Sequence, residues 1–169
     1  LGCKTVLDYG CGKGQQYEWV IPSTGQTIEQ FWGVTVTKYD PAYPPFAKEP
    51  EGKFDLVICT QVLGTIPVSD REWVVKRLHD LSTKAIYISE RLGEARKVVG
   101  SSDLRGREWE DGDWRSLLSQ APYRETTLAT REIVNGEKIT SHWRRGWHGG
   151  WKEVTWPPGV RAMNHKWAP

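Results

Sequence analysis

A short strand that ends on a cluster of glycines constrains this chain more than any other feature. The segment Lys4–Tyr9 is rich in β-forming residues and runs into Asp8-Tyr-Gly10-Cys-Gly12-Lys-Gly14. Glycines at such a turn permit positive φ angles and let a ligand approach the backbone closely. A helix that starts behind the turn offers free N–H groups and its positive dipole end. The segment therefore predicts a ligand-binding turn between a strand and a helix.

The rest of the chain alternates between strand-like and helix-like patterns. Further strands are expected at 34–39, 54–59 and 84–89, and helical segments at 15–21, 27–31, 69–81 and 113–118. The dipeptide Asn135-Gly136 joins two alternating runs, 124–134 and 137–144, and predicts a hairpin. Strands that alternate with helices imply an α/β fold with a mostly parallel sheet, to which the hairpin adds an antiparallel edge.

The longest expected helix begins at Ser69, which suits an N-cap, with Glu72 placed to complete a capping box. His79 lies on its polar side, where we expect it to be solvated. Asp113 is expected to cap the next helix. The apolar face of the 69–81 helix is expected to comprise Trp73, Val74, Arg77, Leu78 and Leu81.

The glycine spacing separates two classes of ligand. A dinucleotide fingerprint reads Gly-x-Gly-x-x-Gly, whereas this turn reads Gly-x-Gly-x-Gly, because Gln15 stands at the sixth position counted from Gly10. Asp8 can bind an ammonium or a hydroxyl group. The combination suits a zwitterionic ligand with a nucleoside, and it favours S-adenosylmethionine over NAD.

Two later strand ends are expected to complete the ligand site. Asp40 follows the second strand, where a carboxylate can accept both ribose hydroxyls; the alternative is a solvated residue that opens a proline-rich turn. The 54–59 strand is expected beside the first strand, so that Cys59, Thr60 and Gln61 face the ligand. Asp55, at the other end of that strand, is expected to be structural.

Three segments together resemble a known family. They are Val6–Gly14, Tyr39-Asp-Pro41 and Phe54–Thr60, and they look like motifs of class I S-adenosylmethionine-dependent methyltransferases. The resemblance covers about residues 4–90 and is closest to small methyltransferase-domain proteins of phage and bacterial genomes. It implies that Asp8 and the glycines hold the methionine end of the cofactor, while Asp40 holds the ribose.

The resemblance also implies a Rossmann-like, mostly parallel seven-stranded sheet with helices on both faces, ending in a reversed antiparallel hairpin. The expected binding residues for S-adenosylmethionine are Asp8, Gly10, Cys11, Gly12, Gly14, Asp40, Pro41, Cys59, Thr60 and Gln61.

The sequence departs from this family at two places. Relatives usually have a helix and a further strand between the ribose acid and the Phe54 strand, but residues 41–53 are too short and too rich in proline for both. That strand is expected to be reduced or absent. Relatives also often carry Asp-Val-Leu-Glu-His-Ile-Pro where this chain has Gln61-Val-Leu-Gly-Thr-Ile-Pro67. The acid, the Glu and the His are all replaced, so no catalytic residue is assigned; His142 is weighed as one and favoured as structural.

The acceptor of the methyl group is left open by the sequence. The leading hypothesis is an active methyltransferase acting on a small molecule or a protein, and the alternatives are a catalytically silent cofactor-binding or interaction module and a nucleic-acid methyltransferase. No Asn/Asp-Pro-Pro-Tyr/Phe tetrapeptide follows the 54–59 strand, which disfavours amino methylation of DNA bases. An NAD oxidoreductase is the least favoured function.

The 169 residues are expected to form one domain over 1–145, on which a tryptophan-rich tail, 146–169, packs. The chain has 10 Trp, and those of the tail are interleaved with basic residues, a pattern that binds single-stranded nucleic acid or, as we favour, packs over the sheet edge. The 3 cysteines show no zinc or disulfide spacing. With no long apolar run, we expect a cytoplasmic protein with no metal. Because the sequence lacks a starting Met and opens almost directly on a strand, we expect a fragment or a chain that lacks an N-terminal helix.

Overall fold

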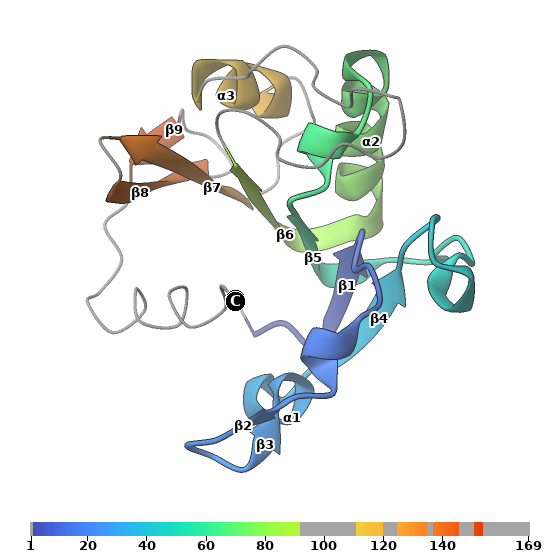
Figure 1. The fold of residues 1–169 in the computed structure, drawn as a ribbon. Helices are drawn as coiled ribbons and strands as arrows, with labels where there is room; N and C mark the ends of the chain where they lie inside the picture. Colours follow the sequence, from blue (N-terminus) through green and yellow to red (C-terminus); the bar gives the residue numbers. More distant parts are fainter. Residues whose placement is uncertain (1, 92–110, 120–124, 135–136, 146–150, 154–169) are drawn as a thin grey trace, which may run out of the picture.

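A seven-stranded sheet organises the fold (Figure 1). The computed structural model describes residues 2–91, 111–119, 125–134, 137–145 and 151–153. Within them the strand order is β4-β1-β5-β6-β7-β8-β9. The strands in that order are Thr35–Tyr39, Thr5–Tyr9, Phe54–Thr60, Ser82–Arg91, Glu125–Val134, Glu137–Arg145 and Trp151–Glu153. The first five strands are mutually parallel, β8 is antiparallel to β7, and β9 is antiparallel to β8, which confirms the expected α/β, mostly parallel sheet.

The hairpin is confirmed as a pair, but its placement differs from the reversed form. Strands β7 and β8 pair antiparallel from Thr126 and Arg145 to Val134 and Glu137. In a reversed hairpin the second strand would lie inside the first, whereas here β7 lies next to β6 and β8 lies outside it. The connection between β6 and β7 carries helix α3, so it can return the chain as an ordinary parallel crossover.

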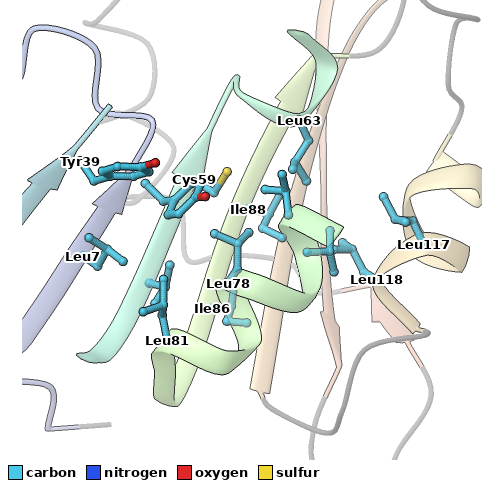
Figure 2. Packing of buried hydrophobic residues seen from close by; sticks show 14 of the residues in the cluster. Leu7, Tyr39, Cys59, Leu63, Leu78, Leu81, Ile86, Ile88, Leu117 and Leu118 are labelled. Atoms are coloured by element: carbon cyan, nitrogen blue, oxygen red, sulfur yellow. The ribbon is translucent and has the colours of Figure 1, made fainter. Parts of the chain in front are cut away.

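One face of the sheet carries the main core, beneath helix α2 (Val68–Leu81) and helix α3 (Asp111–Ser119). Figure 2 shows Leu78, Leu117 and Leu118 packed on strand residues such as Ile86 and Ile88. The buried members of this cluster are Leu7, Tyr9, Tyr39, Phe54, Val57, Cys59, Leu63, Val74, Val75, Leu78, Leu81, Ile86, Ile88, Trp114, Leu117 and Leu118.

The opposite face is covered by shorter elements that follow the glycine turn. Val6 and Val36 pack there with Tyr17 of the 3-10 helix η1 (Gln15–Tyr17) and with Ile28 of helix α1 (Ile28–Trp32). Alternate residues of β1 therefore face different cores, as the period of a strand requires. Helices on both faces of the sheet are thereby confirmed.

The prediction of a helix at 15–21 is wrong. Only the single turn η1 forms, and Val20–Ile21 (β2) then pairs antiparallel with Gln26–Thr27 (β3) as a small separate sheet. Pro22 and Gly25 place a turn between two β-prone dipeptides, so the segment folds back before a helix can propagate. The next expectation is confirmed, because α1 begins directly after Thr27 with a complete capping box.

The segment 41–53 contains no strand, as expected, and its only regular element is the 3-10 turn η2 (Pro44–Phe46). Two contacts fix it to the sheet and to α2. The Asp40 N–H donates to the carbonyl oxygen of Phe46 at 3.0 Å. Arg77 donates through Nε and Nη2 to one oxygen of Glu49, at 3.0 and 2.9 Å.

Helix α2 begins one residue before the expected cap. Pro67 is its N-cap without a side-chain hydrogen bond, so the expected capping box at Ser69 is wrong. The Ser69 hydroxyl donates to the neighbouring Asp70 carboxylate instead. Similarly, α3 begins at Asp111, so Asp113 lies inside the helix rather than at its cap.

The apolar face of α2 is rotated from the expected one. Trp73 is 61% exposed, whereas Val75 is buried beside Leu78. His79, expected to be solvated, is buried at 3% exposure. The helix contacts both the sheet and α3, which widens its buried face beyond the stripe that spacing alone indicates.

The expected loop at 91–112, apart from its ends, the Asn135-Gly136 turn and most of the tail lie outside the described residues, although Trp151–Glu153 forms β9 beside β8. Among the helices described here, none is long and apolar enough to cross a membrane.

The rotated face of α2 makes a testable difference between two large apolar residues. Leu78→Ala should lower the free energy of unfolding by about 3 kcal/mol, because it opens a cavity in a fully buried site. Trp73→Ala, at an exposed position of the same helix, should cost less than about 1 kcal/mol. Urea unfolding followed by circular dichroism measures both, and equal losses would contradict this packing.

Candidate functional site

The glycine loop after β1 is held by the end of the neighbouring strand β4. The N–H groups of Gly10 and Cys11 both donate to the carbonyl oxygen of Tyr39, at 2.7 and 3.0 Å. The N–H of Gly12 donates to Oδ2 of Asp40 at 2.8 Å. Strand β1 lies between β4 and β5, because the chain passes from β1 to β4 on one side and then crosses to β5 on the other. Ligands of open α/β sheets bind at such a switch point.

Two glycines of the loop have different surroundings. Gly10 has φ 86°, and a Cβ there would clash with the Val62 side chain. Gly12 has φ 58°, and a Cβ there would meet nothing within 4 Å. The first glycine therefore permits contact between two loops, and the second presents bare backbone to open space, where a ligand can approach. Gly14 ends the loop as the N-cap residue of η1.

Asp8 is a buried carboxylate next to this loop, with only 2% of its surface exposed. Its Oδ2 accepts hydrogen bonds from the Tyr17 hydroxyl at 2.7 Å and from Nε2 of Gln16 at 3.1 Å. Among the described residues, its Oδ1 has no hydrogen-bond partner. Burial raises the pKa of the Asp8 carboxyl, while the bonds from Tyr17 and Gln16 oppose that rise. A buried oxygen that lacks a donor fits a ligand that brings one, such as an ammonium group.

Asp40 connects the glycine loop with the turn that follows β4. Its Oδ1 accepts the N–H of Ala42 at 2.9 Å, while its Oδ2 accepts that of Gly12. Each carboxylate oxygen keeps a further lone pair, so both remain able to accept hydroxyl groups of a ligand. Pro41 follows it directly and is exposed.

The residues after β5 divide between the core and the surface. Thr60 and Gln61 are exposed at the end of the strand, next to the loop that contains the 3-10 turn η3 (Leu63–Thr65). Cys59 is fully buried, and its thiol lies in the core rather than at this surface (Figure 2).

Two other residues considered from the sequence lie elsewhere. Burial raises the pKa of the Cys11 thiol, in the glycine loop, to about 11, so that thiol is protonated at neutral pH. His142 lies in β8, where only the backbone is described.

Glu90 is a residue of this region that sequence reasoning missed. It is the penultimate residue of β6 and lies one residue beyond the expected strand. It is 2% exposed and accepts N–H groups from Val62, Leu63 and Gly64. Burial raises the pKa of its carboxyl to about 7, although these three bonds and the nearby Arg71 lower it. A polar residue at the carboxyl end of a buried strand was the available signal.

The structural acid Asp55 lies at the opposite end of the sheet, as expected. Its Oδ2 accepts the N–H groups of Lys4 and Thr5, and its Oδ1 lies 3.1 Å from the Lys84 ammonium. These contacts lower the pKa of its carboxyl to about 2. Asp55 therefore fixes strand ends away from the glycine loop.

The raised pKa of Glu90 predicts how stability depends on pH. The folded protein holds this proton up to about pH 7, whereas an unfolded glutamate loses it near 4.5, so the stabilisation present at low pH is lost as the pH rises through 7. Relative to Glu90→Gln, the wild type should lose roughly 2 kcal/mol of unfolding free energy between pH 5 and pH 8. Chemical unfolding at both pH values measures this, and parallel pH profiles would contradict it.

Comparison with known proteins agrees with this geometry. A family model described as a methyltransferase domain matches residues 3–129, which include the glycine loop, Asp40 and the loop after β5. No curated protein matches the chain. Because the model spans well over half of the sequence, the chain belongs to the methyltransferase domain family.

Proposed function

We propose that this chain is a class I methyltransferase that uses S-adenosylmethionine and transfers its methyl group to a small-molecule or protein acceptor. The observation that carries the proposal is the pair of carboxylates, Asp8 and Asp40, that two neighbouring strands bring to one glycine loop. One carboxylate is buried with an oxygen to which no described residue donates, and the other is partly exposed at the rim of the loop. The two acids thus suit the two ends of a ligand that has an ammonium group and a ribose.

Each residue of the site then has a defined part in binding. Asp8 accepts the ammonium group through Oδ1, Gly12 lets the ligand lie against the backbone, and Asp40 accepts the ribose hydroxyls. Thr60 and Gln61 form the neighbouring exposed edge. When bound, the cofactor supplies a methyl group on a sulfonium, which is already electrophilic. The chain's own residues need only hold the two reactants in line, and such alignment supplies much of the rate.

The described residues at the end of β5 bear on the class of acceptor. The exposed residues Thr60 and Gln61 carry no ionisable group, and Gly64 and Thr65 stand where an acid and a histidine would be expected. A general base is needed only for an acceptor that is protonated at neutral pH. The site therefore suits an acceptor that is nucleophilic without assistance from the protein.

Cofactor binding tests the proposal before any acceptor is known. Calorimetry at pH 8 should give micromolar affinity for S-adenosylmethionine and S-adenosylhomocysteine in the wild type. Asp8→Asn and Asp40→Ala should each weaken binding by about tenfold or more, because each loses a charged hydrogen-bond acceptor worth over 1 kcal/mol.

The matched control is Asp55→Asn, which removes another carboxylate that accepts backbone N–H groups, but at the far end of the sheet. It should leave the affinity unchanged. If the folded wild type binds neither ligand, the enzyme proposal fails and the chain acts instead as a catalytically silent interaction module.

A further inference from the structure

The Glu90 carboxylate accepts hydrogen bonds from one short stretch of backbone. Its Oε1 accepts the N–H groups of Val62 and Leu63 at 3.1 and 2.8 Å, and its Oε2 accepts that of Gly64 at 3.2 Å. A Cβ on Gly64 would lie 3.1 Å from Oε2, so the missing side chain at this position leaves room for the carboxylate. Three consecutive amides thus share a single buried acceptor that comes from another strand.

The same loop is tied to β6 a second time, one residue before these amides. Gln61 has φ 58°, an uncommon conformation for a residue other than glycine. Its N–H donates to the carbonyl oxygen of Ser89 at 2.7 Å, and its Nε2 donates to the same oxygen at 3.3 Å. The ends of β6 and β5 therefore determine the path of residues 61–64 together.

The 61–64 loop packs against the glycine loop. The Val62 side chain lies so close to Gly10 that a Cβ on the glycine would clash with it. Because Glu90 holds the N–H of Val62, the position of that side chain against Gly10 depends on the carboxylate. A chain of contacts therefore runs from Glu90 through Val62 to the backbone that is proposed to bind the cofactor.

Stability alone does not account for this carboxylate. Within the part of the chain that the structure describes, the charged or titratable groups that act on it are Arg71 from α2 and the thiol of Cys59 from β5, and burial remains the largest influence. A buried charge of this kind commonly costs stability compared with an uncharged residue of similar size. Such costly groups concentrate at functional sites.

We propose that Glu90 is a positioning residue, whose carboxylate holds the 61–64 loop, and through Val62 the glycine loop, in the geometry that binds the cofactor. This inference rests on the proposed function. It extends that function to a residue that touches neither the cofactor nor the acceptor.

The test compares S-adenosylhomocysteine affinity in the wild type, Glu90→Gln and Asp55→Asn at pH 6 and pH 8. In the wild type, affinity should fall about threefold or more from pH 8 to pH 6, because protonation of Glu90 weakens the hydrogen bonds that its carboxylate accepts from the three amides. Glu90→Gln should bind about tenfold more weakly at pH 8, with little dependence on pH. Asp55→Asn should follow the wild type.

Amide NMR of the wild type provides a second measurement that does not need a folded variant. The N–H signals of Val62, Leu63 and Gly64 should titrate together with a midpoint near pH 7, and that of Gly10 should move with them. Wild-type affinity and pH profile retained in Glu90→Gln, or a Gly10 signal indifferent to this titration, would overturn the inference alone. Failure of the wild type to bind at either pH would remove the proposed function, and this inference with it.

Discussion

The carbonyl oxygen of Tyr39 determines the shape of the site, because it accepts the first two N–H groups of the glycine loop. Its position follows from the parallel pairing of β1 with β4, in which Tyr9 lies opposite Tyr39. Asp40 is the next residue, so the strand end that bends the loop also supplies the carboxylate at its rim. The geometry of the site is thus set by backbone register, and its side chains occupy places that the register has already fixed.

Local patterns were enough to predict most of this arrangement. Glycine spacing and β-branched runs act over a few residues, and the strands and the acids at the strand ends follow from them. Features that depend on distant partners could not be predicted in this way. The exposure of Trp73 and the burial of His79 depend on what α2 packs against, and the role of Glu90 depends on a loop 26 to 28 residues away. In the 15–21 segment, the turn at Pro22 overrode a helical pattern.

The two buried carboxylates lie on opposite faces of the sheet. Asp8 faces the layer of η1 and α1, whereas Glu90 continues the side of β6 that carries Ile86 and Ile88. Both are placed at carboxyl ends of strands, and burial raises the pKa of both. Each therefore lowers stability at neutral pH, a cost that uncharged residues would avoid. Asp8 lies beside the glycine loop and Glu90 beside the 61–64 loop that contacts it. The loss of stability therefore occurs at the candidate site.

The short 41–53 segment shows which parts of the architecture the site can do without. It contains neither a strand nor a helix longer than one turn, yet Asp40 keeps its place through the bond of its N–H to Phe46 and through Oδ1 to Ala42. Two hydrogen bonds from Arg77 to Glu49 hold the far end of the segment on α2; an exposed pair of this kind contributes little energy, but its geometry restricts the path of the loop. Local bonds thus replace a full crossover unit. A methyltransferase domain of this kind can lack a strand at the sheet edge, because the cofactor site that we propose depends on the ends of the inner strands.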